Sequence, residues 1–181
     1  MHLSSPPSTE YAPYFGRYIS LIPEAHFITT LNDQPHELRE LLGKLSAEQA
    51  GYRYAPGKWT VRQVLGHVID AERVFAYRAL CIARGETASL PSFDENQYAD
   101  VAGHDGYVLG ELLDEFQMVR QANVALFGHM DATAWQRVGT VNQHPISTRG
   151  LAYIVVGHAQ HHGVVLRERY GAVLGAVVSP Q

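Results

Sequence analysis

The sequence predicts an all-α protein, a four-helix bundle with one long crossover loop. Four stretches repeat their apolar residues with the period of an α-helix, and few segments carry strand signals. The chain has 181 residues, of which 46% are hydrophobic and 18% are charged, so it can bury one well-packed core. We therefore expect a single folded domain made of long amphipathic helices.

The two ends of the chain are expected to lie outside this domain. Residues 1–13 combine prolines with serine and threonine, which predicts a flexible N-terminal arm that docks only from Tyr14 onward. Residues 14–171 then form the bundle domain, and residues 172–181 form a C-terminal tail.

The first long helix is expected to begin at Asn32 or Asp33, either of which can cap it. Pro35 then falls in the first turn, where a missing N–H group is tolerated, and Gly43 lies near the end. The leucines that share one face of this helix are Leu38, Leu41, Leu42 and Leu45. The preceding residues, 14–31, mix aromatic and aliphatic side chains around a proline and predict one or two short helical pieces.

The second long helix has the clearest start in the chain. Thr60 is its N-cap, Gln63 completes a capping box, and Trp59 can pack on Val64 as a hydrophobic staple. Gly85 lies where the C-terminus of a helix is typical. The inward stripe comprises Val64, His67, Val68, Ala71, Val74, Phe75 and Arg78.

The predicted crossover loop covers residues 85–106. It lacks periodicity and contains glycine and proline breakers, although residues 93–99 can form one short helix. Because long connections in compact domains are usually functional or mobile, this loop is a candidate cover for a site at the end of the bundle. A third long helix follows over residues 107–130.

The last long helix is expected to run from Ser147 or Thr148 to Gly171. A capped turn at residues 131–135 and a loop up to residue 145 precede it. Its inward face carries Leu151, Ile154, Val155, His158, His162, Val165 and Leu166.

Two histidines of this last helix have the spacing of metal ligands. His158 and His162 are four residues apart, so their imidazoles lie one above the other on the same face. His67 on the second long helix supplies a third imidazole, and three histidines with one open position are typical of a catalytic zinc site. We interpret His67, His158 and His162 as candidate metal ligands.

Spacing alone leaves two alternatives equally open, a metal site and a set of core or surface histidines. Pairs of histidines four residues apart arise by chance in a chain that has ten of them. His161 points about 100° around the helix from His162 and is interpreted as a neighbour of the site. Ala159 stands where the HExxH motif of zinc peptidases requires glutamate, which disfavours that chemistry.

Other polar residues have simpler interpretations. Asp70 and Glu72 can orient an imidazole as hydrogen-bond acceptors, but salt bridges with Arg73 or another surface base are the favoured role. The histidines that we assume to be solvated are His2, His26, His36, His104 and His144.

Composition and charge disfavour several classes of partner. The net charge is -4, and the fourteen Lys and Arg residues form no stripe, so we expect no nucleic-acid partner. The sequence has no run of about eighteen apolar residues that could span a membrane, and residues 1–9 lack the features of a signal peptide. We therefore expect a cytoplasmic protein. The single cysteine, Cys81, cannot form an internal disulfide.

Three segments resemble the DinB/YfiT-like superfamily of metalloenzymes, and its YfiT branch in particular. They are KWTVRQVLGHVIDAERVFAYRAL (58–80), LPSFDENQYA (90–99) and RGLAYIVVGHAQHHGVVLRERYG (149–171). The resemblance implies a four-helix bundle in which His67, His158 and His162 bind one divalent ion, commonly zinc or nickel. It also implies a homodimer and a small-molecule substrate, since relatives include thiol-dependent S-transferases and a maleylpyruvate isomerase that uses a low-molecular-weight thiol.

We therefore expect a metal-dependent enzyme of hydrolase or thiol S-transferase type, in which the ion activates water or a low-molecular-weight thiol. The label of metal-dependent hydrolase belongs to the branch by analogy. The alternative is a non-catalytic metal-binding or stress-response bundle, because no general base is identified beside the histidines. No catalytic residue is assigned beyond the three candidate ligands.

Overall fold

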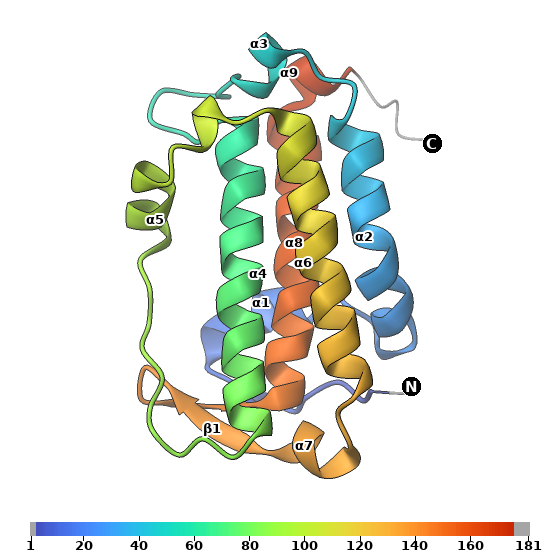
Figure 1. The fold of residues 1–181 in the computed structure, drawn as a ribbon, viewed down its shortest axis with the longest axis vertical. Helices are drawn as coiled ribbons and strands as arrows, with labels where there is room; N and C mark the ends of the chain where they lie inside the picture. The colour runs from blue at the N-terminus through green and yellow to red at the C-terminus, as the bar shows by residue number, and fades with distance from the viewer. Residues whose placement is uncertain (1–2, 176–181) are drawn as a thin grey trace.

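In the computed structural model, which describes residues 3–175, four long helices form a bundle (Figure 1). The helices are α2 (Phe27–Leu42), α4 (Val61–Ala83), α6 (Leu109–Gly128) and α8 (Thr148–Arg169). Both α4 and α2 pack against α6 and α8. The prediction of an all-α four-helix bundle is confirmed.

The bundle does not have a simple up-and-down order. Figure 1 shows α4 and α6 running in the same direction, while α2 and α8 run in the opposite one. The crossover between α4 and α6 returns the chain along the outside of α4 and carries α5 (Glu95–Val101) and the 3-10 turn η4 (His104–Gly106). The crossover loop and its short helix are therefore present as predicted.

The helix α2 begins at Phe27, six residues before the predicted start at Asp33. Phe27 and Leu31 are buried in the core, so tertiary packing extends the helix past the capping signals. Pro35 consequently lies inside the helix instead of in its first turn. Its missing N–H leaves the carbonyl of Leu31 without a helical donor, a gap that another residue fills.

The starts of α4 and α8 agree with the predicted caps. The Thr60 hydroxyl accepts a hydrogen bond from the Gln63 N–H, and the Gln63 side chain accepts one from the Thr60 N–H, which completes the capping box. Ser147 caps α8 by accepting a hydrogen bond from the Gly150 N–H. A second capping box opens the short helix α3 (Ala47–Ala50) at one end of the bundle, beside α9 (Gly171–Leu174).

The segment before α8 was predicted to be a loop, and it is a β-hairpin. After the capped turn α7 (Ala132–Gln136), β1 (Val138–Val141) pairs antiparallel with β2 (His144–Ser147). Asn142 and Gln143 form the two-residue turn, and both have positive φ angles. Strands of four residues are too short to show a clear alternation of apolar and polar side chains, which is why the pattern did not reveal them.

The N-terminal part forms short helical pieces, as predicted for residues 14–31. In that stretch they are η2 (Pro13–Phe15), α1 (Gly16–Ile19) and η3 (Glu24–His26), one more than the one or two expected, and a further turn, η1 (Ser8–Glu10), lies in the predicted arm. The arm docks well before Tyr14, in contrast to the prediction, because Leu3 is buried and Glu10 pairs with Arg149 of α8. Residues 1–2 of the predicted arm and 176–181 of the predicted tail lie outside the described residues.

The buried hydrophobic side chains form two clusters, one on each side of the middle of the bundle. On α4, residues up to Ile69 belong to one cluster and residues from Ala71 to the other; on α8, the change falls between Val156 and Ala159. The buried polar side chains His67 and Glu72 of α4 and His158 of α8 lie near this boundary. Within residues 3–175, no helix has the length and apolar character needed to cross a membrane.

Candidate metal centre

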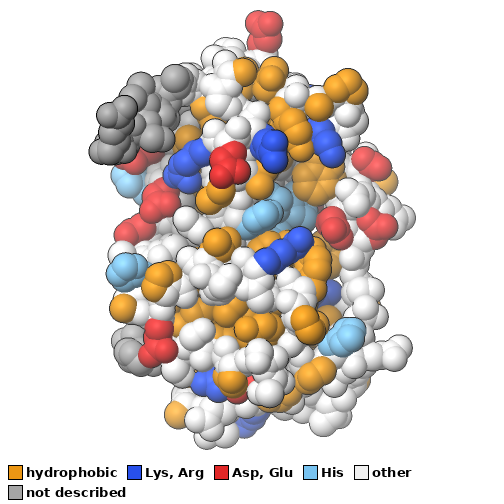
Figure 2. Space-filling view, turned by 180° about the vertical axis from the view of Figure 1, so that it is seen from behind, with side chains coloured by type: hydrophobic (Ala, Val, Ile, Leu, Met, Phe, Trp, Pro, Cys, Tyr) orange, Lys and Arg blue, Asp and Glu red, His pale blue; other side chains and the backbone are white. Residues whose placement is uncertain are grey.

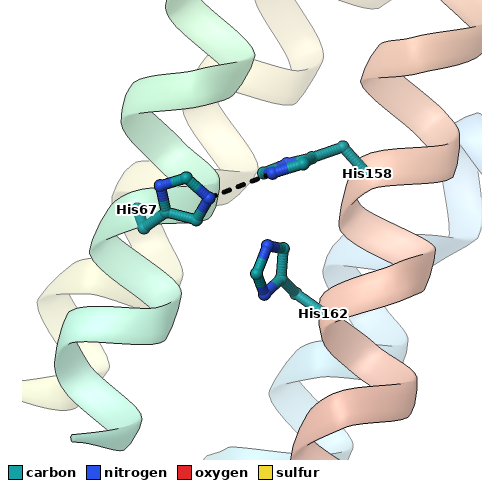
Figure 3. A group of neighbouring side chains, drawn as sticks. All are labelled: His67, His158 and His162. Carbon is teal, nitrogen blue, oxygen red and sulfur yellow. Dashed lines mark hydrogen bonds between the residues drawn. The ribbon is translucent and has the colours of Figure 1, made fainter. Parts of the chain in front are cut away.

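Three imidazoles meet where α4 faces α8 (Figure 3). His67 comes from α4, and His158 and His162 come from successive turns of α8. The Nε2 atoms of His67 and His158 are 3.0 Å apart, and one nitrogen from each of the three rings lies within 4.8 Å of the others. The structure thus brings together the three histidines that the spacing selected.

Glycines beside the histidines allow other segments to pack closely around them. A Cβ atom on Gly157 would lie 2.2 Å from the carbonyl oxygen of Tyr18, so α1 can approach α8 this closely only over a glycine. This approach places the Tyr18 ring 5.3 Å from the His158 ring and 5.4 Å from the His161 ring. The neighbouring His161 therefore contacts the wall of the site and is not among the three converging imidazoles.

Burial keeps the three imidazoles neutral. His67 is 6% exposed and His158 is 4% exposed, while His162 is partly buried. Because the charged form is disfavoured away from water, the pKa of His67 is lowered to about 4, and nearby His104 and His161 add to the effect. Burial and neighbouring imidazoles likewise hold the pKa values of His158 and His162 well below the usual value. Each ring therefore offers a lone pair at neutral pH, as a metal ligand must.

Among the described residues, the fold itself leaves one of these nitrogens without a partner. The Nδ1 atom of His162 is buried and has no hydrogen-bond partner within residues 3–175. The contact between the two Nε2 atoms can use only one proton, whereas two lone pairs can share a cation. Two tetrahedral zinc ligands with bonds of about 2.0–2.1 Å stand about 3.4 Å apart, which lies between the 3.0 Å that separates the Nε2 atoms of His67 and His158 and the 4.8 Å that bounds the three nitrogens. The residues present fit a divalent ion.

The carboxylates near His67 in sequence point elsewhere. Asp70 lies 3.9 Å from Nε2 of His104 and 4.0 Å from Arg73, and buried Glu72 pairs with Arg120. Both take part in salt bridges, as expected, but the partner of Glu72 is the buried Arg120 and not a surface base, because α6 packs against α4 and carries this arginine into the core. His104 was assumed to be solvated, which is wrong: it is buried because the crossover folds back and sets its ring against Gly66.

A cavity of about 460 Å³ adjoins the centre on the side of His67 and His158. It is bounded by the N-terminal segment, α4, the crossover and the hairpin turn. Figure 2 shows that histidine side chains reach the back face of the molecule among hydrophobic groups, with Lys or Arg side chains nearby.

Several residues of this cavity were not predicted as site residues. Phe75 and Arg78 had been placed only on the inward stripe of α4, where an arginine among apolar residues was the available signal. Tyr18 and His144 reach the cavity through the packing of α1 and the hairpin, which no local pattern indicated.

Comparisons with known sequences agree with this picture. The sequence profile of the DinB superfamily matches residues 30–166. The chain is 34% identical over 73 residues to a Bacillus licheniformis protein named provisionally as a metal-dependent hydrolase, covering 40% of this chain and 42% of that protein. A Bacillus cereus protein with the same provisional name is 29% identical over 75 residues, covering 41% and 43% of the two chains. The chain thus matches less than half the length of these curated relatives.

Two solved structures share the fold. YfiT from Bacillus subtilis, described as a four-helix bundle of unusual topology, superposes with a TM-score of 0.75 at 19% identity, over 96% of this chain and 94% of that one. A mycothiol-dependent maleylpyruvate isomerase gives a TM-score of 0.66 at 14% identity, over 89% and 64% of the two chains. The profile match extends across all four long helices and includes the three converging histidines, and we conclude that the chain belongs to the DinB superfamily.

Proposed function

We propose that His67, His158 and His162 hold one divalent metal ion and that the protein is a metal-dependent enzyme acting on a small molecule in the adjoining cavity. The observation that carries this proposal is the convergence of three neutral imidazoles, two of them buried and one partly buried, with the Nδ1 of His162 left without a hydrogen-bond partner in the described chain. The names of the curated relatives, which describe metal-dependent hydrolases, support it. When bound, a divalent ion lowers the pKa of a water or thiol ligand and makes it nucleophilic at neutral pH.

The surrounding aromatic rings pack against the candidate ligands and leave them little exposed to bulk water. The Trp59 ring lies 4.8 Å from that of His67, and the rings of Tyr18 and Phe75 lie 5.3 and 5.7 Å from that of His158. Rings packed this closely restrict the rotation of an imidazole and lower the local dielectric, which strengthens charge interactions in the site. A substrate would enter from the cavity, where His67 and His158 are accessible.

Hydrolysis is the first candidate reaction, and thiol transfer is the second. The observation that favours the second is that the carboxylates nearest to His67 along the chain are held by other side chains, Asp70 by His104 and Arg73 and Glu72 by Arg120. A thiol is deprotonated outright when it coordinates a metal and then needs no such base. The mycothiol dependence of the isomerase with the same fold is in keeping with this candidate.

Metal analysis tests the centre directly. Untagged wild-type protein should contain about one zinc, nickel or similar ion per chain, because imidazole ligands suit these metals. The variant His162→Ala should lose the ion. His161→Ala is the matched control, since His161 lies next to the candidate ligand and is outside the converging set. Equal metal content in wild type and His162→Ala, or equal loss in both variants, would contradict the proposal.

Activity screens separate the two reactions. Metal-loaded protein is offered esters, amides and lactones with and without a low-molecular-weight thiol. Turnover without a thiol, abolished by chelation and restored by metal, supports a hydrolase, and turnover only with a thiol supports a transferase. An occupied site without turnover of any substrate would favour the alternative of a non-catalytic metal-binding or stress-response bundle.

A homodimer, a cytoplasmic location and the absence of a nucleic-acid partner also remain proposals. Light scattering of the purified protein measures its oligomeric state, and cell fractionation measures its location. The net charge of -4 supports the third, because a phosphate backbone repels an acidic protein.

A further inference from the structure

We infer that Arg78 anchors a carboxylate group of the substrate, at the end of the cavity away from the histidines. The substrate would then be a small monocarboxylic acid with an apolar middle. Anion binding by Arg78 stands on its own observations, whereas its link to a reaction rests on the proposed function of the histidine centre.

The charge of Arg78 faces the rings of Phe75 and Phe93 but pairs with no carboxylate of the described chain. Its side chain is only 5% exposed, and its Nη2 donates a hydrogen bond of 2.7 Å to the carbonyl oxygen of Pro91. Within residues 3–175 no carboxylate lies at ion-pair distance from it, whereas the equally buried Arg120 is paired with Glu72. An arginine stays protonated in proteins, and a buried charge is costly unless it is paired. Arg78 is therefore a candidate binding site for an anion.

The guanidinium lies in the same cavity as the histidines. Its Cζ atom is 5.8 Å from the centre of the Phe75 ring, and that ring is 5.7 Å from the centre of the His158 ring. These two steps place the guanidinium carbon at most 11.5 Å from the His158 ring. Arg78 follows His67 by three turns of α4, and helical side chains lean toward the N-terminus, so its head reaches back toward the centre. One small molecule can therefore contact both ends.

The walls between the two ends select the rest of the ligand. The Phe15 ring lies 6.2 Å from that of Phe75, and Phe93 lies 5.5 Å from the guanidinium carbon of Arg78, so the middle of the cavity is aromatic. A volume of about 460 Å³ is in the usual range for small-molecule sites. A carboxylate matches the planar fork of a guanidinium, with two parallel hydrogen bonds. Glu95 lines the same cavity and disfavours an anion with more than one negative charge, such as a phosphate ester.

Calorimetry on the metal-loaded protein tests the inference. The probes are phenylalkanoates of increasing chain length, and each acid is compared with its neutral amide. At least one acid should bind more tightly than its amide. Arg78→Gln should weaken binding of that acid roughly ten- to a hundredfold and leave the amide unchanged, because a hydrogen bond to a charged group is lost. Arg39→Gln is the matched control, since Arg39 pairs with Asp114 on the surface.

A second arm separates this inference from the metal proposal, because a carboxylate can also bind a metal. If the preference for the acid disappears in His162→Ala and persists in Arg78→Gln, the carboxylate binds at the metal and the role of Arg78 is refuted. If it disappears in Arg78→Gln and persists in His162→Ala, Arg78 is the anchor whatever the fate of the metal proposal. Equal weakening of acid and amide in a folded Arg78→Gln, or no binding of any acid to wild type at millimolar concentrations, would overturn the inference.

Discussion

Two buried polar groups occupy the middle of the bundle, and they are built in opposite ways. The histidine cluster consists of His67, His158 and His162, and the arginine network consists of Gln34, Glu72, Arg120 and Asn123. In the network, Arg120 donates to both carboxylate oxygens of Glu72 at 2.6 and 2.8 Å, and Asn123 donates to Glu72 at 3.1 Å. In the histidine cluster, the buried Nδ1 of His162 has no partner within the described chain.

The arginine network also completes the backbone of α2. The Nη1 atom of Arg120 donates to the carbonyl oxygen of Leu31 at 2.9 Å and to Gln34 at 2.7 Å. The Leu31 carbonyl lacks a helical donor because Pro35, four residues later, has no N–H. The charged groups of the network, Arg120 and Glu72, are thus paired within the fold, so its presence needs no ligand. The histidine cluster lacks such an explanation, and this contrast is what makes it the functional candidate.

The largest expected effect comes from breaking the arginine network. Arg120→Met should lower the free energy of unfolding by roughly 3–5 kcal/mol, because it leaves the Glu72 carboxylate buried without its partner. Urea unfolding followed by circular dichroism measures this loss. The double variant Glu72→Met/Arg120→Met should recover most of it, since no charge then stays buried alone. A loss below about 1 kcal/mol in the single variant would mean that the network is not a structural element.

The next effect concerns the histidine cluster and pH. The pKa of His67 is about 4 in the folded protein and near 6.5 in an unfolded chain, so the unfolded state binds more protons between these values. Metal-free protein should therefore lose stability as the pH falls from about 6.5 to 4, by about 1.4 kcal/mol per pH unit and roughly 3 kcal/mol in all for His67. Unfolding of chelated protein at a series of pH values measures the slope. His67→Phe should reduce it, and an unchanged slope would show that His67 is protonated equally in both states.

The long elements of the fold could be predicted because each carries its own signals. The Thr60 capping box and the Ser147 cap are local, and they set the starts of α4 and α8. The start of α2 could not be predicted in the same way, because Phe27 and Leu31 become helical through burial in a core that forms between distant segments. The hairpin was missed because its strands are short and its turn uses Asn142 and Gln143 without a glycine.

The candidate site shows the same division. Spacing was sufficient to select His158 and His162, since a helix fixes the relation between residues four apart. The partners of Glu72 and Arg78 could not be predicted, because they depend on how α6 and the crossover pack against α4. The informative property, a buried polar group with or without a partner, exists only in the folded chain.

A smaller effect is expected where the arginine network touches the helix that carries the histidines. Gln34 donates to the carbonyl oxygen of Val156 at 2.9 Å, two residues before His158, and accepts from Arg120. Gln34→Leu should cost roughly 1–3 kcal/mol of stability, because Arg120 loses an acceptor. Zinc affinity, measured with a competing chelator, should change less than tenfold. A loss of about ten- to a hundredfold would instead mean that the network positions the ligands.

The smallest effect is expected from a change in the N-cap of α4. It tests whether the histidine cluster and the arginine network depend on the stability of this helix. Each group has one member on α4, His67 in the histidine cluster and Glu72 in the arginine network, and His67 lies about two turns beyond the Thr60 cap, outside the first turn that the cap stabilises. Thr60→Ala removes the cap and the hydrogen bond of 2.5 Å to Asp105, and it should cost about 1 kcal/mol. Thr60→Ser retains the hydroxyl and should stay close to wild type. Neither variant should alter the zinc affinity or the slope of stability against pH. If either quantity fell together with the stability of Thr60→Ala, the contrast between the two groups would be due to the stability of α4 as a whole.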